Sequence, residues 1–149
     1  MAANQDFKDL LQELNESGVK YLVVGAYARI YYTEPRYTKD IDIWVEPTLR
    51  NAGKLWKVLA SFGAPLENVQ VKDFTCEELV YQIGVEPNRI DIMMGVPGLK
   101  FPRAWRNRVK TTYGGQEISI LSRNDLIKAK RVSGRAQDKL DIEALTSRK

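Results

Sequence analysis

The chain has 149 residues, 44% of them hydrophobic, and a formal net charge of +4. This length suits one domain, spanning residues 1–149, around one hydrophobic core. The sequence contains no histidine, which excludes a histidine general base and zinc sites built on histidine, and its single cysteine, Cys76, cannot form an internal disulfide. No signal run or membrane-spanning run is present, so we expect a cytoplasmic protein with no membrane partner.

The first predicted elements are a helix, a strand and a second helix. The helix at 5–17 has its apolar residues on one stripe, and Gly18 follows as a stop signal. The segment "VKYLVVG" predicts a buried strand that ends at Gly25, and "AYARIYY" then resumes a helical pattern. A glycine at such a junction lets a phosphate approach the helix N-terminus, although a simple tight turn gives the same pattern. The stripe of the first helix consists of Phe7, Leu10, Leu11 and Leu14.

The stretch "YTKDIDIWVEP" places two aspartates on alternate positions of a predicted strand. Asp40 and Asp42 therefore project from the same face, roughly 7 Å apart, while Ile41 and Ile43 point into the core. Paired carboxylates repel each other, and a hard cation such as Mg²⁺ relieves that repulsion. The segment "RIDIMM" repeats the alternation around Asp91, which can be a third ligand or a polar residue on the outer face of the sheet.

The remaining elements predict a mixed fold. Thr48 is a helix cap, and the helix after it ends near Gly63; its core face is expected to contain Leu49, Ala52, Leu55, Trp56 and Leu59. A capping-box pattern, the signature of a helix start, joins Thr75 to Glu78. Two hairpins follow, one around "EPN" and one at "GG". Ser122, with Asp125, begins a helical segment at about 122–147 that breaks near Gly134. The fold class is α/β (α+β), with a mixed β-sheet flanked by helices.

Basic residues recur near these motifs. Arg36 and Lys39 lie beside the paired aspartates, either as neutralising salt bridges or as a phosphate clamp. In "FPRAWRNRVK", Trp105 lies among several cations. This pattern is typical of a nucleic-acid path, and equally of a solvated helix face whose tryptophan packs on the core.

The combination of motifs resembles a known family. "VVGAYARIYYTEPRYTKDIDIWV" joins a glycine at a strand end to Asp-x-Asp, "RIDIMM" adds a strand aspartate, and "LSRNDLIKAKRVSGRAQDKLDIEAL" closes the chain with a lysine on a helix. Over about residues 20–145 the sequence is similar to the nucleotidyltransferase superfamily with the DNA polymerase β-like fold. In particular, it is similar to the minimal bacterial nucleotidyltransferases and the AbiEii-type toxin group.

The resemblance implies a set of roles. The metal ligands and catalytic residues would be Asp40, Asp42 and Asp91, with two Mg²⁺ ions (or Mn²⁺) and with Asp91 as the base. The nucleotide-binding residues would be Gly25, Ala26, Arg36, Thr38 and Lys130. Ala26 departs from the family pattern, which has Gly or Ser there, but its backbone N–H remains available to a phosphate.

The reaction implied is transfer of a nucleoside monophosphate from an NTP, expected to be ATP, to a hydroxyl of RNA, protein or a small molecule. The sequence lacks the "GxxxxGK[ST]" loop of the common kinases and ATPases, which favours this reaction over γ-phosphoryl transfer. A role in a toxin–antitoxin pair, with a companion protein chain, is a further expectation. Two alternatives are a nucleotide-binding module without turnover and a basic RNA-binding module.

Overall fold

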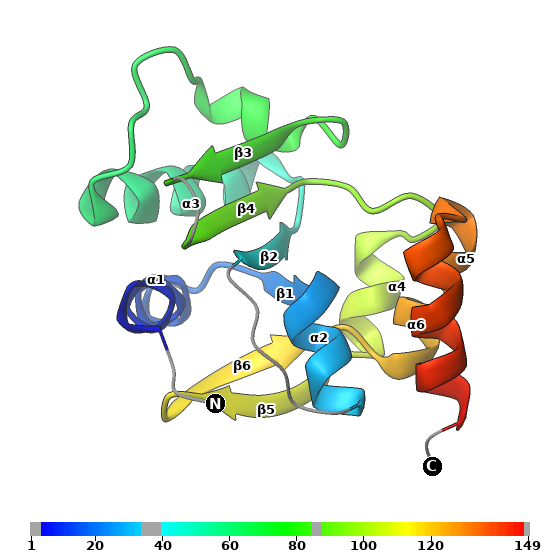
Figure 1. Ribbon diagram of the computed structural model, residues 1–149. Coiled ribbons are helices and arrows are strands. Elements are labelled where there is room, and N and C mark those ends of the chain that lie inside the picture. Colours follow the sequence, from blue (N-terminus) through cyan, green and yellow to red (C-terminus); the bar gives the residue numbers. More distant parts are fainter. Residues whose placement is uncertain (1–3, 34–39, 85–87, 148–149) are drawn as a thin grey trace.

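The computed structural model describes residues 4–33, 40–84 and 88–147 (Figure 1). Over these residues the strands form one sheet in the order β3-β4-β2-β1-β6-β5. The strands are β1 (Tyr21–Val24), β2 (Asp40–Val45), β3 (Val80–Ile83), β4 (Arg89–Met93), β5 (Val109–Tyr113) and β6 (Gln116–Ile120). The helices are α1 (Gln5–Glu16), α2 (Gly25–Tyr32), α3 (Leu49–Phe62), α4 (Phe101–Arg106), α5 (Arg123–Ser133) and α6 (Ala136–Ser147), with a 3-10 turn, η1, at Val71–Thr75.

The sheet is mixed, as predicted. β1 pairs with β2 antiparallel and with β6 parallel, and β2 pairs with β4 parallel. Both predicted hairpins are confirmed, because β3 pairs antiparallel with β4 and β5 pairs antiparallel with β6. The polypeptide between the parallel strands β2 and β4 crosses one face of the sheet as α3 and returns through the outer strand β3 (Figure 1).

Polar caps fix where two of the predicted helices begin. The Thr48 hydroxyl accepts a hydrogen bond from the backbone N–H of Asn51, and the Ser122 hydroxyl accepts one from the N–H of Asp125. Such bonds satisfy N–H groups that have no partner inside the helix. The predicted break near Gly134 is confirmed, since this residue has a φ of 67° at the end of α5.

Strand alternation divides the interior into two cores. One core contains Ile41, Ile43, Ile90 and Ile92 and packs under α1 and α3, while the opposite face of the sheet packs against α2, α4, α5 and α6 (Figure 1). The predicted stripe of α1 lies in the first core and is fully buried; it consists of Phe7, Leu10, Leu11 and Leu14. Residues that alternate with the isoleucines of β2 and β4 therefore face the second helical layer.

Two local predictions were wrong. Leu49 is 66% exposed, because it is the first residue of α3 and the apolar stripe becomes buried only from Ala52 onward, with Trp56 partly buried against the core. The capping-box pattern between Thr75 and Glu78 starts no helix. Instead Thr75 ends η1, whose own capping box joins Gln70 to Asp73. The side chain of Asp73 accepts a hydrogen bond from the N–H of Gln70, so the cap forms upstream of the predicted one.

Leu14 provides a test of the first core. Substitution Leu14→Ala is expected to lower the free energy of unfolding by about 2 to 5 kcal/mol, because the side chain is fully buried and its removal leaves a cavity. Leu49→Ala, the same change at an exposed helical position, is the matched control and should cost less than about 0.5 kcal/mol. Urea unfolding of both variants measures the difference, and equal losses would contradict the assignment of the core.

Candidate active site

The strand register brings the predicted aspartates together on two neighbouring strands, β2 and β4. Asp42 of β2 lies opposite Val24 of β1 on one side and opposite Asp91 of β4 on the other. Asp40 lies opposite Arg89 in the same parallel pair. Because Ile41 and Ile43 are buried in the first core, Asp40 and Asp42 share the other face of the sheet, as predicted. The carboxylates therefore gather at the end of β1, where the chain turns into α2.

Gly25 forms that turn and contacts the carboxylate of Asp42 closely. Its φ is 65°, and a Cβ placed on it would lie 2.1 Å from Oδ2 of Asp42. A side chain at this position would displace the carboxylate as well as strain the backbone. Glycine is therefore required here for two reasons, the positive φ of the turn and the close approach of Asp42 to the backbone. Ala26 follows as the second residue of α2.

Arg89 is a part of the site that the sequence analysis did not include. Its Nε lies 2.9 Å from Oδ1 of Asp91 and its Nη2 lies 3.2 Å from Oδ2 of the same carboxylate. The same Nη2 lies 3.3 Å from Oδ2 of Asp40. One guanidinium thus bridges two of the three carboxylates. The signal was present in "RIDIMM", because residues two apart on a strand share a face.

The surroundings of Asp42 disfavour its charged form. Burial, followed by the nearby negative charges of Asp91 and Asp40, raises its pKa from 3.8 to about 6, and the positive charge of Arg89 opposes this rise only in part. A raised pKa of this kind is typical of carboxylates crowded at functional sites. The site in the metal-free protein therefore binds a proton more tightly than an exposed aspartate does.

This raised pKa predicts a pH-dependent stability. Since the folded state holds the proton of Asp42 more tightly than the unfolded state, its stability should fall as pH rises from about 4 to about 6, by about 3 kcal/mol from this group alone. Asp42→Asn should lack this contribution. The free energy of unfolding of both proteins is measured by urea unfolding in EDTA across this pH range. The difference between the two pH profiles separates the contribution of Asp42 from that of the other carboxyl groups. Parallel pH profiles would contradict the crowding of Asp42.

A cavity of about 360 Å³ opens beside Gly25 and Asp42. Its opposite wall is formed by α5 and the start of α6 and carries Lys130, Ser133 and Arg135. The remaining lining is mostly apolar and consists of Val24, Met93, Val96, Pro97, Leu121, Leu126, Ala129 and Val132, with Asp138. The structure therefore places Lys130 on the same cavity as the Gly25 turn, with the Asp42 carboxylate on the strand side and Lys130, Arg135 and Asp138 on the helical side.

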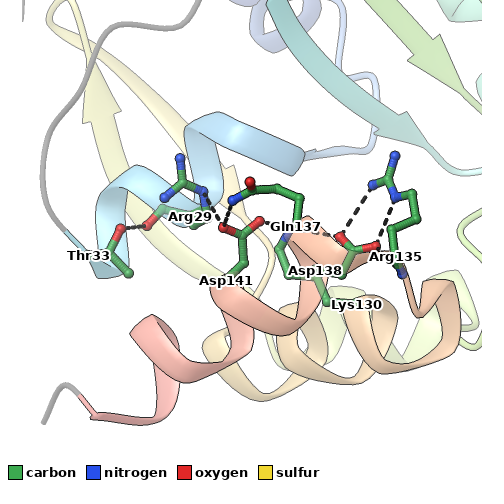
Figure 2. A network of polar contacts seen from close by, with 7 residues as sticks. All are labelled: Arg29, Thr33, Lys130, Arg135, Gln137, Asp138 and Asp141. Atoms are coloured by element: carbon green, nitrogen blue, oxygen red, sulfur yellow. Dashed lines mark hydrogen bonds and ion pairs between the residues drawn. The ribbon is translucent and has the colours of Figure 1, made fainter.

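Lys130 is held by a network of buried ionic groups (Figure 2). Its Nζ lies 2.9 Å from Oδ2 of Asp141 and 3.5 Å from Oδ1 of Asp138, and both aspartates are buried. Asp141 also accepts a hydrogen bond from Gln137 at 2.9 Å and lies 3.6 Å from Nε of Arg29. The network ties α2, α5 and α6 together. These partners could not be predicted from local sequence patterns, because they lie on two other helices, α2 and α6.

The other carboxylate of the network pairs with an exposed cation. Arg135 donates to Asp138 from its backbone N–H and from its guanidinium, with Nε at 2.8 Å from Oδ2. These hydrogen bonds outweigh burial and hold the pKa of Asp138 far below its usual range. Burial would raise the pKa of Asp141, but hydrogen bonds from Lys130 and Gln137 outweigh it and lower that pKa too. Both aspartates are therefore ionised at neutral pH, against the positive charges of Arg29, Lys130 and Arg135.

The other predicted residues have different outcomes. Arg36 and Thr38 lie outside the described residues. Trp105 stacks on Phe101, with ring centres 5.9 Å apart, and the guanidinium carbon of Arg108 lies 4.0 Å from the centre of its ring. The tryptophan is thus packed on the core, which was the second of the two interpretations of this segment.

Within residues 4–33, 40–84 and 88–147, no group of three or more His, Cys, Asp or Glu side chains is arranged as a metal-ligand set. In the same residues, no helix is long and apolar enough to cross a membrane.

Solved structures share this architecture. The lincosamide antibiotic adenylyltransferase LnuA, solved with lincomycin, superposes with a TM-score of 0.63 at 17% identity and covers 98% of each chain. A protein of Thermotoga maritima described as a nucleotidyltransferase gives a TM-score of 0.63 at 14% identity, covering 95% of this chain and 90% of its own. ANT(2″)-Ia, an antibiotic-resistance factor, gives 0.61 at 10% identity, covering 95% and 81%. The fold is therefore that of the nucleotidyltransferases.

A comparison of the sequence with models of protein families also assigns the chain to a family. Residues 1–147 match the family described as "Nucleotidyltransferase of unknown function (DUF6036)", and the chain belongs to this family. A comparison with curated proteins gave no match.

Proposed function

We propose that the protein is a metal-dependent nucleotidyltransferase that moves a nucleoside monophosphate from an NTP to a hydroxyl group. The observation that carries this proposal is the position of Asp42, opposite Asp91 and against the Gly25 turn, on a cavity whose far wall holds Lys130. A carboxylate with a second one opposite it on the neighbouring strand, together with a lysine across the cavity, suits a substrate that brings both phosphates and metal ions. We also propose that residues 1–149 act as a single domain.

The donor set supports binding of a divalent metal. Asp40, Asp42 and Asp91 supply carboxylate oxygens, the ligands that Mg²⁺ and Mn²⁺ prefer. A cation already lies between two of them in the form of the Arg89 guanidinium, which shows that this part of the site stabilises positive charge. When bound, divalent ions would neutralise phosphate charge and lower the pKa of the attacking hydroxyl.

The Gly25 turn and the far wall of the cavity would bind the nucleotide. The backbone N–H groups at Gly25 and Ala26 are the first of α2 and offer donors to a phosphate without a side-chain hydroxyl. Lys130 would contact the phosphates from the opposite side, and Arg36 and Thr38 complete the proposed set. The nucleotide we propose as donor is ATP.

The transfer step follows from these positions. The acceptor hydroxyl oxygen forms a bond to the α-phosphorus, the bond from that phosphorus to the α,β-bridging oxygen breaks, and pyrophosphate leaves toward Lys130. Asp91 receives the hydroxyl proton, since a carboxylate is the base available in a chain without histidine. The products are the nucleotidylated acceptor and pyrophosphate, so charge and atoms balance.

The acceptor is a hydroxyl of RNA, of a protein or of a small molecule. Two of the similar structures, LnuA with lincomycin and ANT(2″)-Ia with adenylyl-2″-tobramycin, contain small hydroxylated antibiotics. That likeness supports a small molecule as the first class to test. A protein or RNA target, with a companion chain and a role as a toxin, remains the second class that we propose to test.

Two observations favour a second candidate, a nucleotide-binding module without turnover. Lys130 is already neutralised by Asp138 and Asp141, and Ala26 lacks the hydroxyl that the family pattern often provides. A phosphate would then be held more weakly than in an active transferase. Turnover distinguishes the two candidates.

The proposal predicts which phosphate of ATP is transferred. With Mg²⁺ and ATP labelled at the α- or the γ-phosphate, acceptors drawn from total RNA, total protein and a panel of hydroxylated antibiotics should gain label from the α-position alone. Pyrophosphate should be released in equal amount. Labelling from the γ-position would show a kinase, whereas bound nucleotide without label from either position would support the binding module. Asp91→Ala is the control that should lose transfer.

A further inference from the structure

Arg89 lies between two of the three carboxylates of the proposed metal site, Asp40 and Asp91. Its guanidinium contacts Asp91 through two nitrogens, at 2.9 and 3.2 Å, and Asp40 through one, at 3.3 Å. Bidentate contacts between arginine and a carboxylate are among the strongest hydrogen bonds in proteins. The guanidinium therefore occupies both carboxylate oxygens of Asp91 and one of Asp40, which are ligands of the proposed metal site.

The register of the sheet fixes this arrangement. Asp40 and Arg89 are directly opposed across the parallel strands β2 and β4, and Arg89 and Asp91 are two residues apart on one strand. Both relations place the guanidinium on the carboxylate face whether or not a ligand is bound. The contact therefore belongs to the architecture of the site, and the side chain is long enough and exposed enough to leave it, being 31% exposed.

The contact reduces the electrostatic repulsion among the three carboxylates. The side chains of Asp40, Asp42 and Asp91 are crowded on one face, and without a neighbouring cation they would repel one another. Arg89 supplies one positive charge, whereas a divalent ion supplies two. An ion that binds Asp40 and Asp91 must take over oxygens that the guanidinium holds, so the two cations compete.

We propose that Arg89 is a built-in placeholder cation, which holds Asp40 and Asp91 in the metal-free protein and must release them before a divalent ion binds. The inference rests on the proposed function, because it takes the three aspartates as metal ligands. As a consequence, a higher concentration of metal is needed to fill the site. The apparent metal affinity is the intrinsic affinity multiplied by the fraction of molecules in which Arg89 has released the carboxylates.

Direct Mn²⁺ binding, measured by electron paramagnetic resonance without nucleotide and without turnover, tests this exchange. Arg89→Gln, which cannot form the ionic bridge, should bind Mn²⁺ on the order of tenfold more tightly than the wild type. Arg89→Lys keeps the charge but loses the planar fork, so its affinity should lie between the two. Arg135→Gln removes a cation that lines the cavity beside Asp42 and is paired with Asp138, so it should change Mn²⁺ affinity by less than about threefold.

Thermal unfolding gives a second readout. Without metal, Arg89→Gln should melt below the wild type, and saturating Mn²⁺ should raise its melting temperature by more than it raises that of the wild type. Equal Mn²⁺ affinities for the wild type and both Arg89 variants would overturn the placeholder while leaving the proposed metal site in place. An affinity of Arg89→Lys equal to the wild type, with tighter Arg89→Gln, would reduce the effect to charge repulsion and also overturn it. Absence of Mn²⁺ binding in all of these proteins would remove the metal site itself.

Discussion

Asp42→Ala is expected to abolish Mg²⁺-dependent ATP binding while leaving the fold intact. Asp42 contacts the Gly25 turn, faces Asp91 and lines the cavity that carries Lys130, so its removal takes away the carboxylate shared by the proposed metal and phosphate sites. Calorimetric titration with ATP and Mg²⁺ measures the loss. The metal-free variant should be at least as stable as the wild type, because burial and two neighbouring carboxylates disfavour the charge of Asp42.

The control for this experiment is Asp9→Ala. Asp9 is an exposed residue of α1 whose carboxylate accepts a hydrogen bond from Gln5, and its loss changes the net charge by the same amount. ATP affinity should be unchanged in this variant. Equal ATP affinities for the wild type and Asp42→Ala would contradict the proposed metal site, although the fold would remain that of the nucleotidyltransferases.

The second large effect is expected at Asp141. Asp141→Ala should lower the free energy of unfolding by about 3 to 5 kcal/mol, because the buried Arg29 and the partly buried Lys130 would lose a carboxylate that now lies 3.6 and 2.9 Å from them. Urea unfolding near neutral pH measures the loss. Glu143→Ala, at an exposed position of the same helix, is the matched control and should change stability by less than about 0.5 kcal/mol.

The pH dependence of this variant checks the cause. Hydrogen bonds to the charged form outweigh burial and hold the pKa of Asp141 below its ordinary value. The stabilisation from this group is therefore present above its unfolded pKa and lost as pH falls through its folded pKa. The gap between wild type and Asp141→Ala should accordingly narrow in acid. A gap that is constant with pH, or a loss below about 1 kcal/mol at neutral pH, would mean that the network contributes little through charge.

Much of the fold could be predicted because its signals are local. The period-two pattern of "DIDIWV" correctly placed Asp40 and Asp42 on one face and the isoleucines in the core, and the stripe of α1 was fully confirmed. Hydrophobic periodicity depends on neighbours along the chain, so it can be read without knowing the strand order. The Leu49 and Thr75 errors occurred at helix ends, where a single residue can lie outside the repeating pattern.

The site was only partly predictable because its contacts are non-local. Composition and spacing suggested Asp91 as a third carboxylate, but only the pairing of β2 with β4 brings it opposite Asp42. Arg89 was overlooked because an arginine at a strand start is ordinary until its partners are known. Lys130 was predicted as a phosphate ligand, yet its two buried carboxylate partners lie on another helix.

The parallel pairing of β2 with β4 also has a consequence for how the protein folds. Parallel strands cannot be joined by a hairpin turn. Asp42 and Asp91 therefore come together only after the crossover through α3 and β3 has formed. Closing long loops before their contacts form slows folding, whereas isolated helical turns appear on the microsecond scale. On dilution from urea, helical circular dichroism should thus recover before the proposed Mn²⁺ binding does, and a chain trapped between the two events would have secondary structure but would not bind metal.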